Sequence, residues 1–293
     1  FRLLPKELAA ETFVEMEPED QELLIRGFSD NELKEVLDEL YVDDAVDIIE
    51  EMPANVVRRI LSQADPEMRQ SINQILRYPE NSAGAWMTTE YVSLRPAMTV
   101  EEAILRIRRQ GVDKETIYTC YVVDRGRKLI GVVSLKSLVI SPDTMKVSDL
   151  MHDDPVVAHV DDDQEEVSDL FTRYGYLAIP VVDNEFRLVG IVTVDDAVDV
   201  IQEEATEDIH MMAAVTPLDD SYMEASILDI AKSRLPWLLV LMISAVLSET
   251  VLARNTTLIV LIPALTYFTP MLMGSAGNAG SQAAAMVIRG ITV

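Results

Sequence analysis

Basic residues are scarce in this chain, which has 24 Lys and Arg against 50 Asp and Glu and a formal net charge of −26. Residues 231–293 contain one acid and four bases, which leaves 49 acids against 20 bases in residues 1–230. No Lys or Arg occurs between Leu188 and Ala231. A region this acidic repels phosphate backbones, so the composition argues against nucleic acid as a partner and favours inorganic cations or a basic protein.

Cysteine and histidine are also few. The single cysteine, Cys120, lies in the strand-like run IYTCYVV, so a disulfide framework is excluded and a buried thiol in a reducing cytoplasm is expected. The three histidines, His152, His159 and His210, are scattered, and the sequence has no nucleophile and base pair, Cys/His cluster or phosphate-binding loop. We therefore expect no enzyme activity. The chain also lacks an initiator methionine and ends directly after an apolar segment, which predicts a fragment of a longer protein.

The densest acidic stretch is TVDDAVDVIQEEATED at residues 193–208, with seven acids and no base. In a helix, Asp196, Asp199, Glu203 and Glu207 would form one stripe. The stretch contains six like-charge pairs three or four residues apart, which together cost roughly 1–3 kcal/mol at about 0.2–0.5 kcal/mol each. Either water screens this repulsion, or cations bind the carboxylates of the stripe.

Residues 1–80 predict short amphipathic helices joined by brief turns, with Pro at several helix starts. Apolar residues recur at helical spacing and the units are similar in size, which favours a small α-solenoid. The acids of VDDAVD (42–47) are either first-turn residues that complement a helix dipole or cation ligands. The expected helices span Pro5–Glu17, Pro18–Gly27, Asp30–Leu40, Asp43–Met52, Pro53–Gln63 and Pro66–Arg77.

Residues 87–201 contain an internal repeat. YVVDRGRKLIGVVSLKSLV at 121–139 matches PVVDNEFRLVGIVTVDDAV at 180–198 with an offset of 59 residues. Upstream, the copies match at an offset of 64, and the difference is an insertion near Arg108–Glu115. Each copy predicts strand, helix, strand, strand and helix.

The repeat resembles the tandem CBS domain, or Bateman module, since each copy carries a G-[VI]-V-[ST] motif. The resemblance implies an α/β fold and adenine nucleotide binding between the copies, where a Thr or Ser and an Asp three positions later hold the ribose. The second copy has Thr193 and Asp196, whereas the first has Ser134 followed by Ser137. Thr193 and Ser134 are therefore the candidate nucleotide contacts.

The C-terminal part predicts membrane spans. Leu235–Ala253 and Thr257–Met273 are apolar runs of suitable length. Lys232 and Arg234 precede the first run, so the positive-inside rule places the acidic region in the cytoplasm. A connecting helix, Asp219–Ser233, is expected before it, either as a plain linker or with a mechanical role.

The second run continues into the small-residue sequence MLMGSAGNAGSQAAAM. Gly277, Asn278 and Gln282 lie there among small residues, which favours either a close helix interface or a polar pore lining. We take these three as pore-lining candidates.

The order of these parts resembles the MgtE family of bacterial magnesium channels and transporters. The most specific matches are ATEDIH (205–210), GIVTVDD (190–196) and GNAGSQ (277–282). The resemblance implies a homodimer with five spans per subunit in the bacterial inner membrane. It also implies Mg²⁺ as the transported ion and as a regulatory ion that binds between cytosolic domains and holds the pore shut. The CBS resemblance adds ATP as a candidate ligand.

Carried over residue by residue, the resemblance implies Mg²⁺ contacts from acids of the helical domain, the second CBS copy and the acidic stretch, and from backbone near two further positions. These are Glu11, Asp43, Asp47, Asp163, Glu165, Asp196, Asp199, Glu204, Glu207 and Asp208, with backbone near Ala85 and Thr172. Gly175 stands where an acid is expected. Taken alone, Asp163 and Glu165 are equally explained as first-turn acids, with Asp163 and Glu166 forming a capping box.

The sequence thus predicts a multidomain protein with an all-α superhelical domain, an α/β tandem CBS pair, a connecting helix and α-helical spans. The expected boundaries are 1–80, 81–141, 142–205, 206–233 and 234–293. The expected function is a Mg²⁺ channel or transporter that its own cytosolic domains close when they bind Mg²⁺. Two alternatives are a CBS nucleotide sensor that regulates transport of another solute, and a membrane-anchored regulator that transports nothing.

Overall fold

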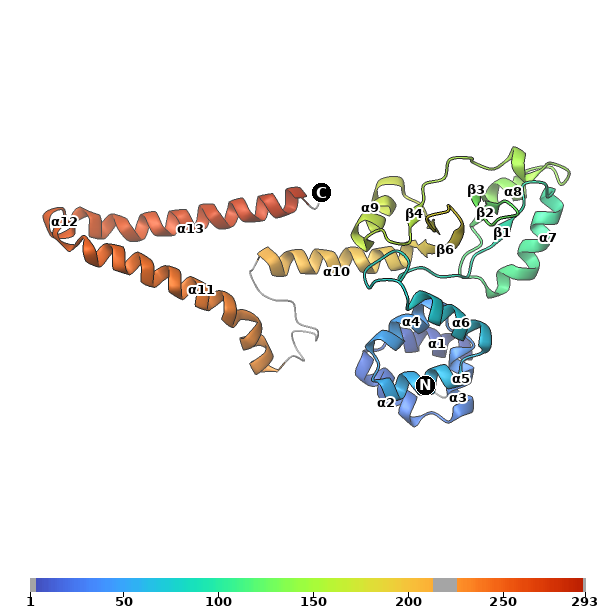
Figure 1. Ribbon diagram of the computed structural model, residues 1–293, viewed down its shortest axis with the longest axis horizontal. Helices are drawn as coiled ribbons and strands as arrows, with labels where there is room; N and C mark the ends of the chain where they lie inside the picture. The colour runs from blue at the N-terminus through green and yellow to red at the C-terminus, as the bar shows by residue number, and fades with distance from the viewer. Residues whose placement is uncertain (1–3, 213–225, 292–293) are drawn as a thin grey trace. The chain divides into compact units, whose positions relative to one another are not determined.

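The computed structural model describes residues 4–212 and 226–291, and the chain divides into two compact units, Phe1–Ile201 and Gln202–Val293. Each unit is described by itself below. The first unit contains a helical domain followed by two repeated α/β copies, and the second is helical (Figure 1).

Six short helices make up the described part of the helical domain. They are α1 (Lys6–Val14), α2 (Pro18–Gly27), α3 (Asp30–Leu37), α4 (Val42–Glu51), α5 (Ala54–Gln63) and α6 (Pro66–Ile75). All six predicted helices are confirmed, although α1, α3 and α6 end a few residues earlier than expected.

Local sequence signals explain where these helices begin. Pro18 and Pro66 occupy the first turns of α2 and α6, where the missing N–H costs no helical hydrogen bond. Ser29 and Glu32 form a capping box on α3, and Asp65 caps α6 by accepting a hydrogen bond from the Met68 N–H. Each signal acts within three residues, so the sequence alone is sufficient to place these starts.

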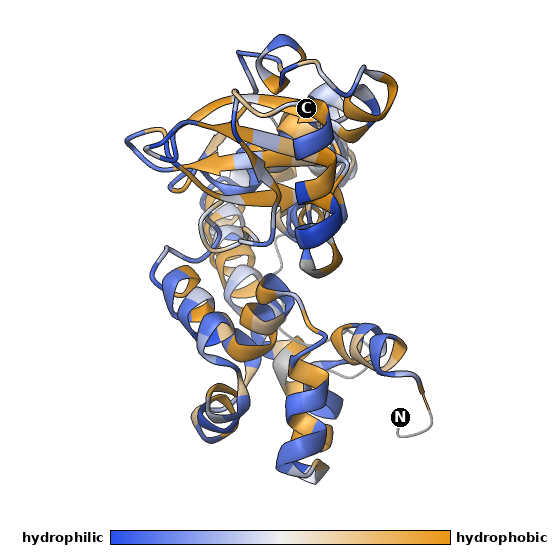
Figure 2. Ribbon diagram, turned by 90° about the vertical axis from the view of Figure 1, so that its right-hand side faces the viewer, coloured by the Kyte–Doolittle hydropathy of each residue, from blue (hydrophilic) through white to orange (hydrophobic). Residues whose placement is uncertain are grey.

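Alternate helices of the domain pack on one another: α1 on α3, α3 on α5 and α4 on α6 (Figure 1). This arrangement is that of a short helical solenoid. Fully buried aliphatic side chains, among them Leu33, Ile60 and Ile72, form its core. In Figure 2 the helices of this domain show both hydrophobic and hydrophilic colours, as amphipathic helices should.

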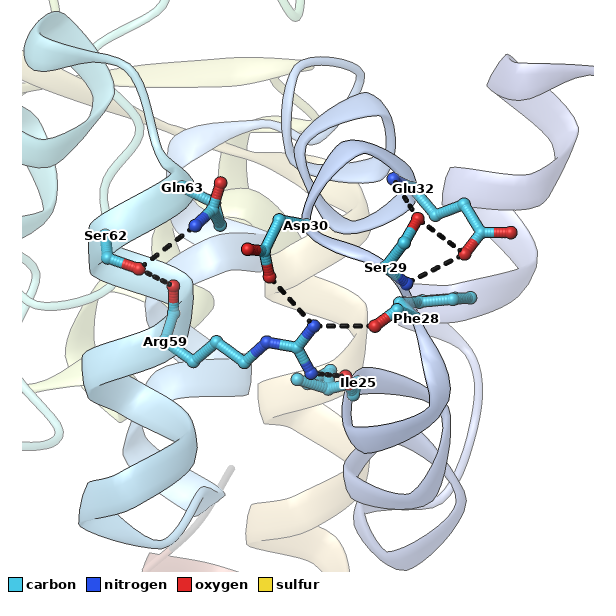
Figure 3. A network of polar contacts seen from close by, with 8 residues as sticks. All are labelled: Ile25, Phe28, Ser29, Asp30, Glu32, Arg59, Ser62 and Gln63. Atoms are coloured by element: carbon cyan, nitrogen blue, oxygen red, sulfur yellow. Dashed lines mark hydrogen bonds and ion pairs between the residues drawn. The ribbon is translucent and has the colours of Figure 1, made fainter.

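Arg59 on α5 ties the end of α2 to the start of α3 (Figure 3). Its guanidinium donates to the carbonyls of Ile25 at 2.5 Å and Phe28 at 2.6 Å, and to the Asp30 carboxylate at 3.1 Å. The last carbonyls of a helix have no intrahelical donor, so the guanidinium satisfies groups that would otherwise need water.

The two α/β copies follow the predicted order. The first contains β1 (Ser93–Leu94), α7 (Val100–Gln110), the short 3-10 turn η1 (Gly111–Asp113), β2 (Thr119–Val123), β3 (Leu129–Ser134) and α8 (Leu135–Ile140). After the 3-10 turn η2 (Val147–Asp149), the second contains β4 (Ala158–His159), α9 (Gln164–Tyr174), β5 (Ala178–Val182), β6 (Leu188–Thr193) and α10 (Val194–Met212).

Each copy forms a three-stranded sheet, in the orders β1-β2-β3 and β4-β5-β6. The first strand pairs parallel to the second, and the second pairs antiparallel to the third. The strands are largely hydrophobic in Figure 2, and Cys120 is buried in β2 as predicted. Burial raises the pKa of its thiol to about 12.

The two hairpin turns are built alike and meet each other. Asp124 accepts hydrogen bonds from the N–H groups of Gly126 and Lys128, and Asp183 accepts from those of Glu185 and Arg187. Backbone bonds then join the turns, from Leu129 N to the Phe186 carbonyl and from Leu188 N to the Arg127 carbonyl. The repeat noted in the sequence therefore becomes a pseudo-twofold pair.

The repeated glycines of the motif are required by close backbone approach. A Cβ on Gly131 would lie 2.5 Å from the His152 carbonyl oxygen, and a Cβ on Gly190 would lie 2.7 Å from the Thr88 carbonyl oxygen. At these points the neighbouring segments bond to the strands, with His152 bonded to Val132 and Thr88 to Ile191. A side chain at either glycine would displace the crossing segment.

In its described part, the second unit contains the end of α10 from Gln202 onward, then α11 (Ile227–Arg254), α12 (Thr256–Leu261) and α13 (Ala264–Ile291). By length and composition, one helix among the described residues, Ile230–Arg254, could cross a membrane. This helix contains the first predicted span.

Two expectations for this unit need correction or lie outside the described residues. The prediction of the second span, Thr257–Met273, as one continuous helix is wrong, because the helix is interrupted at Ile262 and Pro263, between α12 and α13. Proline lacks the N–H that would continue the helix and disfavours the α conformation of the residue before it. The predicted connecting helix, Asp219–Ser233, lies partly outside the described residues, and from Ile227 onward it is the first part of α11.

Candidate cation site

Three carboxylates from distant parts of the first unit meet at one point. They belong to Asp43 in the first turn of α4, Glu115 just after η1, and Asp196 in the first turn of α10. One oxygen from each lies within 4.8 Å of the others. Asp43 is buried, and Glu115 and Asp196 are half-buried. The cluster thus joins the helical domain to both α/β copies.

Hydroxyl groups hold two of these carboxylates in place. Thr193, buried at the end of β6, donates its hydroxyl hydrogen to the Asp196 carboxylate at 2.6 Å. The Thr88 and Thr193 hydroxyls also lie within hydrogen-bonding reach of Glu115. Neutral donors of this kind orient a carboxylate without cancelling its charge.

The electrostatics of the cluster are uncompensated. Burial, followed by repulsion from Asp196, raises the pKa of Glu115 to about 7. Burial also raises the pKa of Asp196 to about 6, with neighbouring acids adding repulsion and the Thr193 hydroxyl opposing it. Burial and the charge of Glu115 hold the pKa of Asp43 well above its usual range.

Two oxygens of the cluster also accept no hydrogen bond from the described residues. These are Asp43 Oδ1 and Glu115 Oε2, both of which are buried. Two charges separated by the 4.8 Å limit of the cluster repel by roughly 3–4 kcal/mol at an effective dielectric constant of about 20. At neutral pH the cluster therefore requires protons or a cation.

The donor set suits a hard divalent cation. Carboxylate oxygens are the ligands that Mg²⁺ and Ca²⁺ take, and the cluster offers no sulfur or imidazole that would favour a softer metal. Mg²⁺ keeps several of its waters and is usually held by few carboxylates. Three carboxylates from three parts of the fold would bind such an ion and at the same time hold those parts together.

Comparison with known proteins identifies the parts of this fold. Residues 1–81 match the family model of the MgtE intracellular N domain, and residues 83–141 and 147–203 each match the CBS domain. The chain is 42% identical to a solved structure, the cytosolic domain of the Mg²⁺ channel MgtE in complex with ATP, with a TM-score of 0.65. That match covers 68% of this chain and 81% of the other. The chain belongs to the MgtE family.

Curated members of the MgtE family extend the similarity along the chain. The magnesium transporter MgtE of Thermus thermophilus is 40% identical over 293 residues, which is 99% of this chain and 65% of the relative. The Bacillus subtilis magnesium transporter MgtE is 34% identical over 278 residues, which is 95% of this chain and 61% of the relative. The chain therefore spans somewhat under two thirds of the length of these relatives.

The structure brings together only two of the acids that the MgtE resemblance pointed to. Asp43 and Asp196 belong to the cluster, whereas Glu11 on α1 and Asp47 on α4 are exposed. Among the described residues, neither Glu11 nor Asp47 joins a group of three ligand-bearing side chains. Their role as ligands stays a prediction.

Sequence reasoning missed Glu115. The one signal that pointed to it was the insertion near Arg108–Glu115, which makes the two copies differ in length. The insertion gives the first copy the turn η1, and the chain after η1 carries Glu115 to α4 and α10. The direction of that turn depends on tertiary packing, so the insertion alone could not identify Glu115 as a candidate ligand.

The other acids of the acidic stretch lie along α10, which confirms the helix but not their role. Asp199 and Glu207 are exposed, and Glu204 and Asp208 are half-buried. From Gln202 onward α10 belongs to the second unit. The ligand roles of these four residues stay predictions.

Asp163 of the second CBS copy has a structural role. Asp163 caps α9 by accepting a hydrogen bond from the Glu165 N–H, which confirms its interpretation as a helix cap. The bond goes to Glu165, not to Glu166 as a capping box would require. Ala85 and Thr172 are half-buried and exposed respectively. None of these four positions contributes to the three-carboxylate cluster.

The backbone conformation at position 175 explains why glycine stands there and not the expected acid. It ends α9 in the left-handed conformation, with φ of 65°, and its N–H bonds to the Phe171 carbonyl. Glycine adopts this conformation without the steric cost that a side chain brings.

The two candidate nucleotide contacts lie in different environments. Thr193 is bonded to Asp196 within the cation cluster. Ser134 borders an open pocket of about 360 Å³ between the copies, here called the Ser134 pocket, which Ser137, His152 and Tyr176 also line. The open space therefore lies beside the copy whose motif lacks the Asp.

The pore-lining candidates Gly277, Asn278 and Gln282 lie on α13, where all three are exposed. A Cβ on Gly277 would meet nothing within 4 Å among the atoms that the structure describes. Their assignment to a pore stays a prediction.

Proposed function

We propose that this chain is the regulatory region and the beginning of the membrane region of a Mg²⁺ channel or transporter, and that cytosolic Mg²⁺ closes it. The observation that carries the proposal is the cluster of Asp43, Glu115 and Asp196, in which one residue is buried and two are half-buried. The identity of the transported ion is inferred from the relatives named magnesium transporters and from the solved Mg²⁺-channel domain.

The proposed switch is the interface between the helical domain and the CBS pair. At low Mg²⁺, repulsion among the three carboxylates favours separation of the helical domain from the pair. At high Mg²⁺, the ion replaces that repulsion with attraction and favours the closed arrangement. The acids of α10 and the exposed Glu11 and Asp47 would contribute further weak sites.

The switch would reach the membrane through the chain itself. The positive-inside rule places the acidic region on the cytoplasmic side of the membrane that α11 enters, because Lys232 and Arg234 lie near its start. α10 and α11 belong to one continuous chain, so we propose that a displacement of the CBS pair acts on α11. The bacterial inner membrane is the expected location.

A homodimer is the proposed assembly, with the second copy of the chain covering an apolar face of the CBS pair. Exposed hydrophobic side chains occur at equivalent positions of the two copies: Tyr118 and Leu177, 64% and 54% exposed, and Val139 and Val198, 65% and 46% exposed. The backbone bonds Leu135 to Tyr118 and Val194 to Leu177, so Tyr118 and Leu177 lie beside the first residues of α8 and α10. Val139 and Val198 lie four residues further along these two helices. A repeated apolar face suits a symmetric partner.

The test is Mg²⁺ uptake by the full-length protein in a Mg²⁺-requiring host, together with Mg²⁺ titration of this chain. Wild-type uptake should fall as cytosolic Mg²⁺ rises, and Asp196→Asn should keep uptake high. Mg²⁺ should also raise the melting temperature of the chain more than monovalent salt of equal ionic strength does. If the two salts raise the melting temperature equally, the proposal that this chain senses Mg²⁺ is wrong.

ATP is a second candidate ligand, and the Ser134 pocket favours it. The pocket is open, has hydroxyls at Ser134 and Ser137, and is bordered by Tyr176, whose ring could stack on a base. The solved relative contains ATP. ATP titration of the wild type and of Tyr176→Ala would test it, since loss of the ring should weaken binding and leave Mg²⁺ stabilisation unchanged.

A further inference from the structure

A second cavity, of about 680 Å³, lies between the helical domain and the first CBS copy. It is separate from the Ser134 pocket and holds none of the three cluster carboxylates. Its helical-domain side carries the acids Asp38, Asp65 and Glu67, and its CBS side carries the bases Arg106, Arg109 and Lys114 together with the acid Glu90. We call it the mixed-charge cleft.

The three bases of the mixed-charge cleft are available for a ligand. Arg106 donates only to the Gln110 side chain, at 3.1 Å, and none of the three bases forms an ion pair among the described residues. This is notable because residues 1–230 hold only 20 bases against 49 acids.

Stabilisation of the α7 dipole does not account for this grouping. Arg108 and Arg109 both lie in the last turn of α7, where a base complements the helix dipole. Only Arg109 lines the cleft. Arg106 lies a turn earlier and Lys114 lies beyond η1, yet both line the cleft with it.

The charge pattern selects the chemistry of the ligand. A free anion would be attracted by the bases but repelled by Asp38 and Glu67, and a free cation would meet the opposite conflict. A polyphosphate with its bound Mg²⁺ satisfies both sides, because phosphate oxygens pair with guanidinium and ammonium groups while the hydrated cation faces carboxylates.

We propose that the mixed-charge cleft binds the magnesium complex of a polyphosphate chain, with its phosphates on Arg106, Arg109 and Lys114. The polyphosphate would be inorganic or the tail of a nucleotide. The volume is within the range of small-molecule sites. Val42 lines the cleft and precedes Asp43, and Lys114 precedes Glu115, so an occupied cleft would hold together two of the three parts that the cation cluster joins.

Magnesium pyrophosphate is the probe, because it has no nucleoside to enter the Ser134 pocket. Binding of radiolabelled pyrophosphate to the whole chain in detergent micelles is measured with Mg²⁺ and with EDTA. The variants are Arg106→Gln with Arg109→Gln, and separately Lys114→Gln. Arg108→Gln is the matched control on the same helix.

We expect saturable binding that is weaker by about tenfold or more in both cleft variants and with EDTA, since each change removes a charged contact. Arg108→Gln should bind as the wild type does. Magnesium ATP should displace the probe and adenosine should not. Unchanged affinity in both cleft variants, equal affinity in EDTA, or displacement by adenosine would overturn the site. The Mg²⁺ sensor is tested without pyrophosphate, so its failure is distinguishable from this outcome.

Discussion

The Thr193 hydroxyl donates to the Asp196 carboxylate at 2.6 Å, so the two residues that the CBS motif offers to a ribose are joined to each other in the second copy. At the equivalent positions of the first copy, the hydroxyls of Ser134 and Ser137 lie 2.8 Å apart beside an open pocket. The extra carboxylate is what allows the second copy to contribute to the candidate cation site. Duplication has thus given one motif two chemical environments.

Replacing Glu115 with Gln should reduce the stabilisation that Mg²⁺ provides. A ligand that binds only the folded, closed state adds about 1–3 kcal/mol at several-fold to a hundredfold above its Kd. Without Mg²⁺ the variant should melt at a higher temperature than the wild type, because one buried charge is gone. Circular dichroism melts with and without Mg²⁺ measure both effects. Glu39→Gln, at an exposed position, is the control, and a full Mg²⁺ response in Glu115→Gln would show that Glu115 is not a ligand.

Stability without Mg²⁺ should fall as the pH rises from about 4 to about 7. The pKa is raised by burial to about 7 for Glu115 and to about 6 for Asp44 and Asp196. The folded state therefore binds more protons than the unfolded state, and its stability is highest at low pH and is lost as these groups ionise.

Saturating Mg²⁺ should offset this loss, because the ion binds the ionised carboxylates. Mg²⁺ affinity should accordingly increase between pH 6 and pH 8, and binding near pH 6.5 should release protons, which calorimetry in buffers of different ionisation enthalpy detects. A Mg²⁺ affinity that does not change with pH would count against the cluster as the binding site.

Gly175→Asp should strengthen the Mg²⁺ response at a cost in stability. Gly175 has φ of 65°, and a Cβ added there would meet no described atom within 4 Å, so the substitution fits sterically and costs about 1–2 kcal/mol for the left-handed conformation. Gly175→Asn is the matched control, because it carries a similar conformational cost without the charge. If both variants respond to Mg²⁺ as the wild type does, this position contributes no ion contact.

Arg59→Met should destabilise the helical domain by about 1–3 kcal/mol, because the carbonyls of Ile25 and Phe28 lose a charged donor. Urea unfolding measures the change. Arg58→Met is the control, since Arg58 is exposed and donates to the Ala54 carbonyl of its own helix. Equal losses in the two variants would assign the effect to helix propensity and not to the contacts across helices.

The predicted helices and the repeat depended on signals that act over short distances. Pro18, Ser29 and Asp65 mark helix starts through groups no more than three residues away. The matched hairpins follow from alternating apolar residues and from Asp124 and Asp183, whose side chains bond to their own turns. Pro263 broke the second apolar run, and local reasoning could have found that break as well.

By itself, the sequence determined the helical domain, the paired α/β copies, the acidic character and the apolar α11, because propensity, periodicity and charge are properties of neighbouring residues. Only the tertiary structure decided which acids meet. Asp43, Glu115 and Asp196 are separated by 72 and 81 residues, and each alone is indistinguishable from a solvated or capping acid. Their meeting depends on how the helical domain packs and on the direction of the turn after α7. Both are set by burial of apolar surface between residues far apart in the sequence, so no local sequence pattern predicts them.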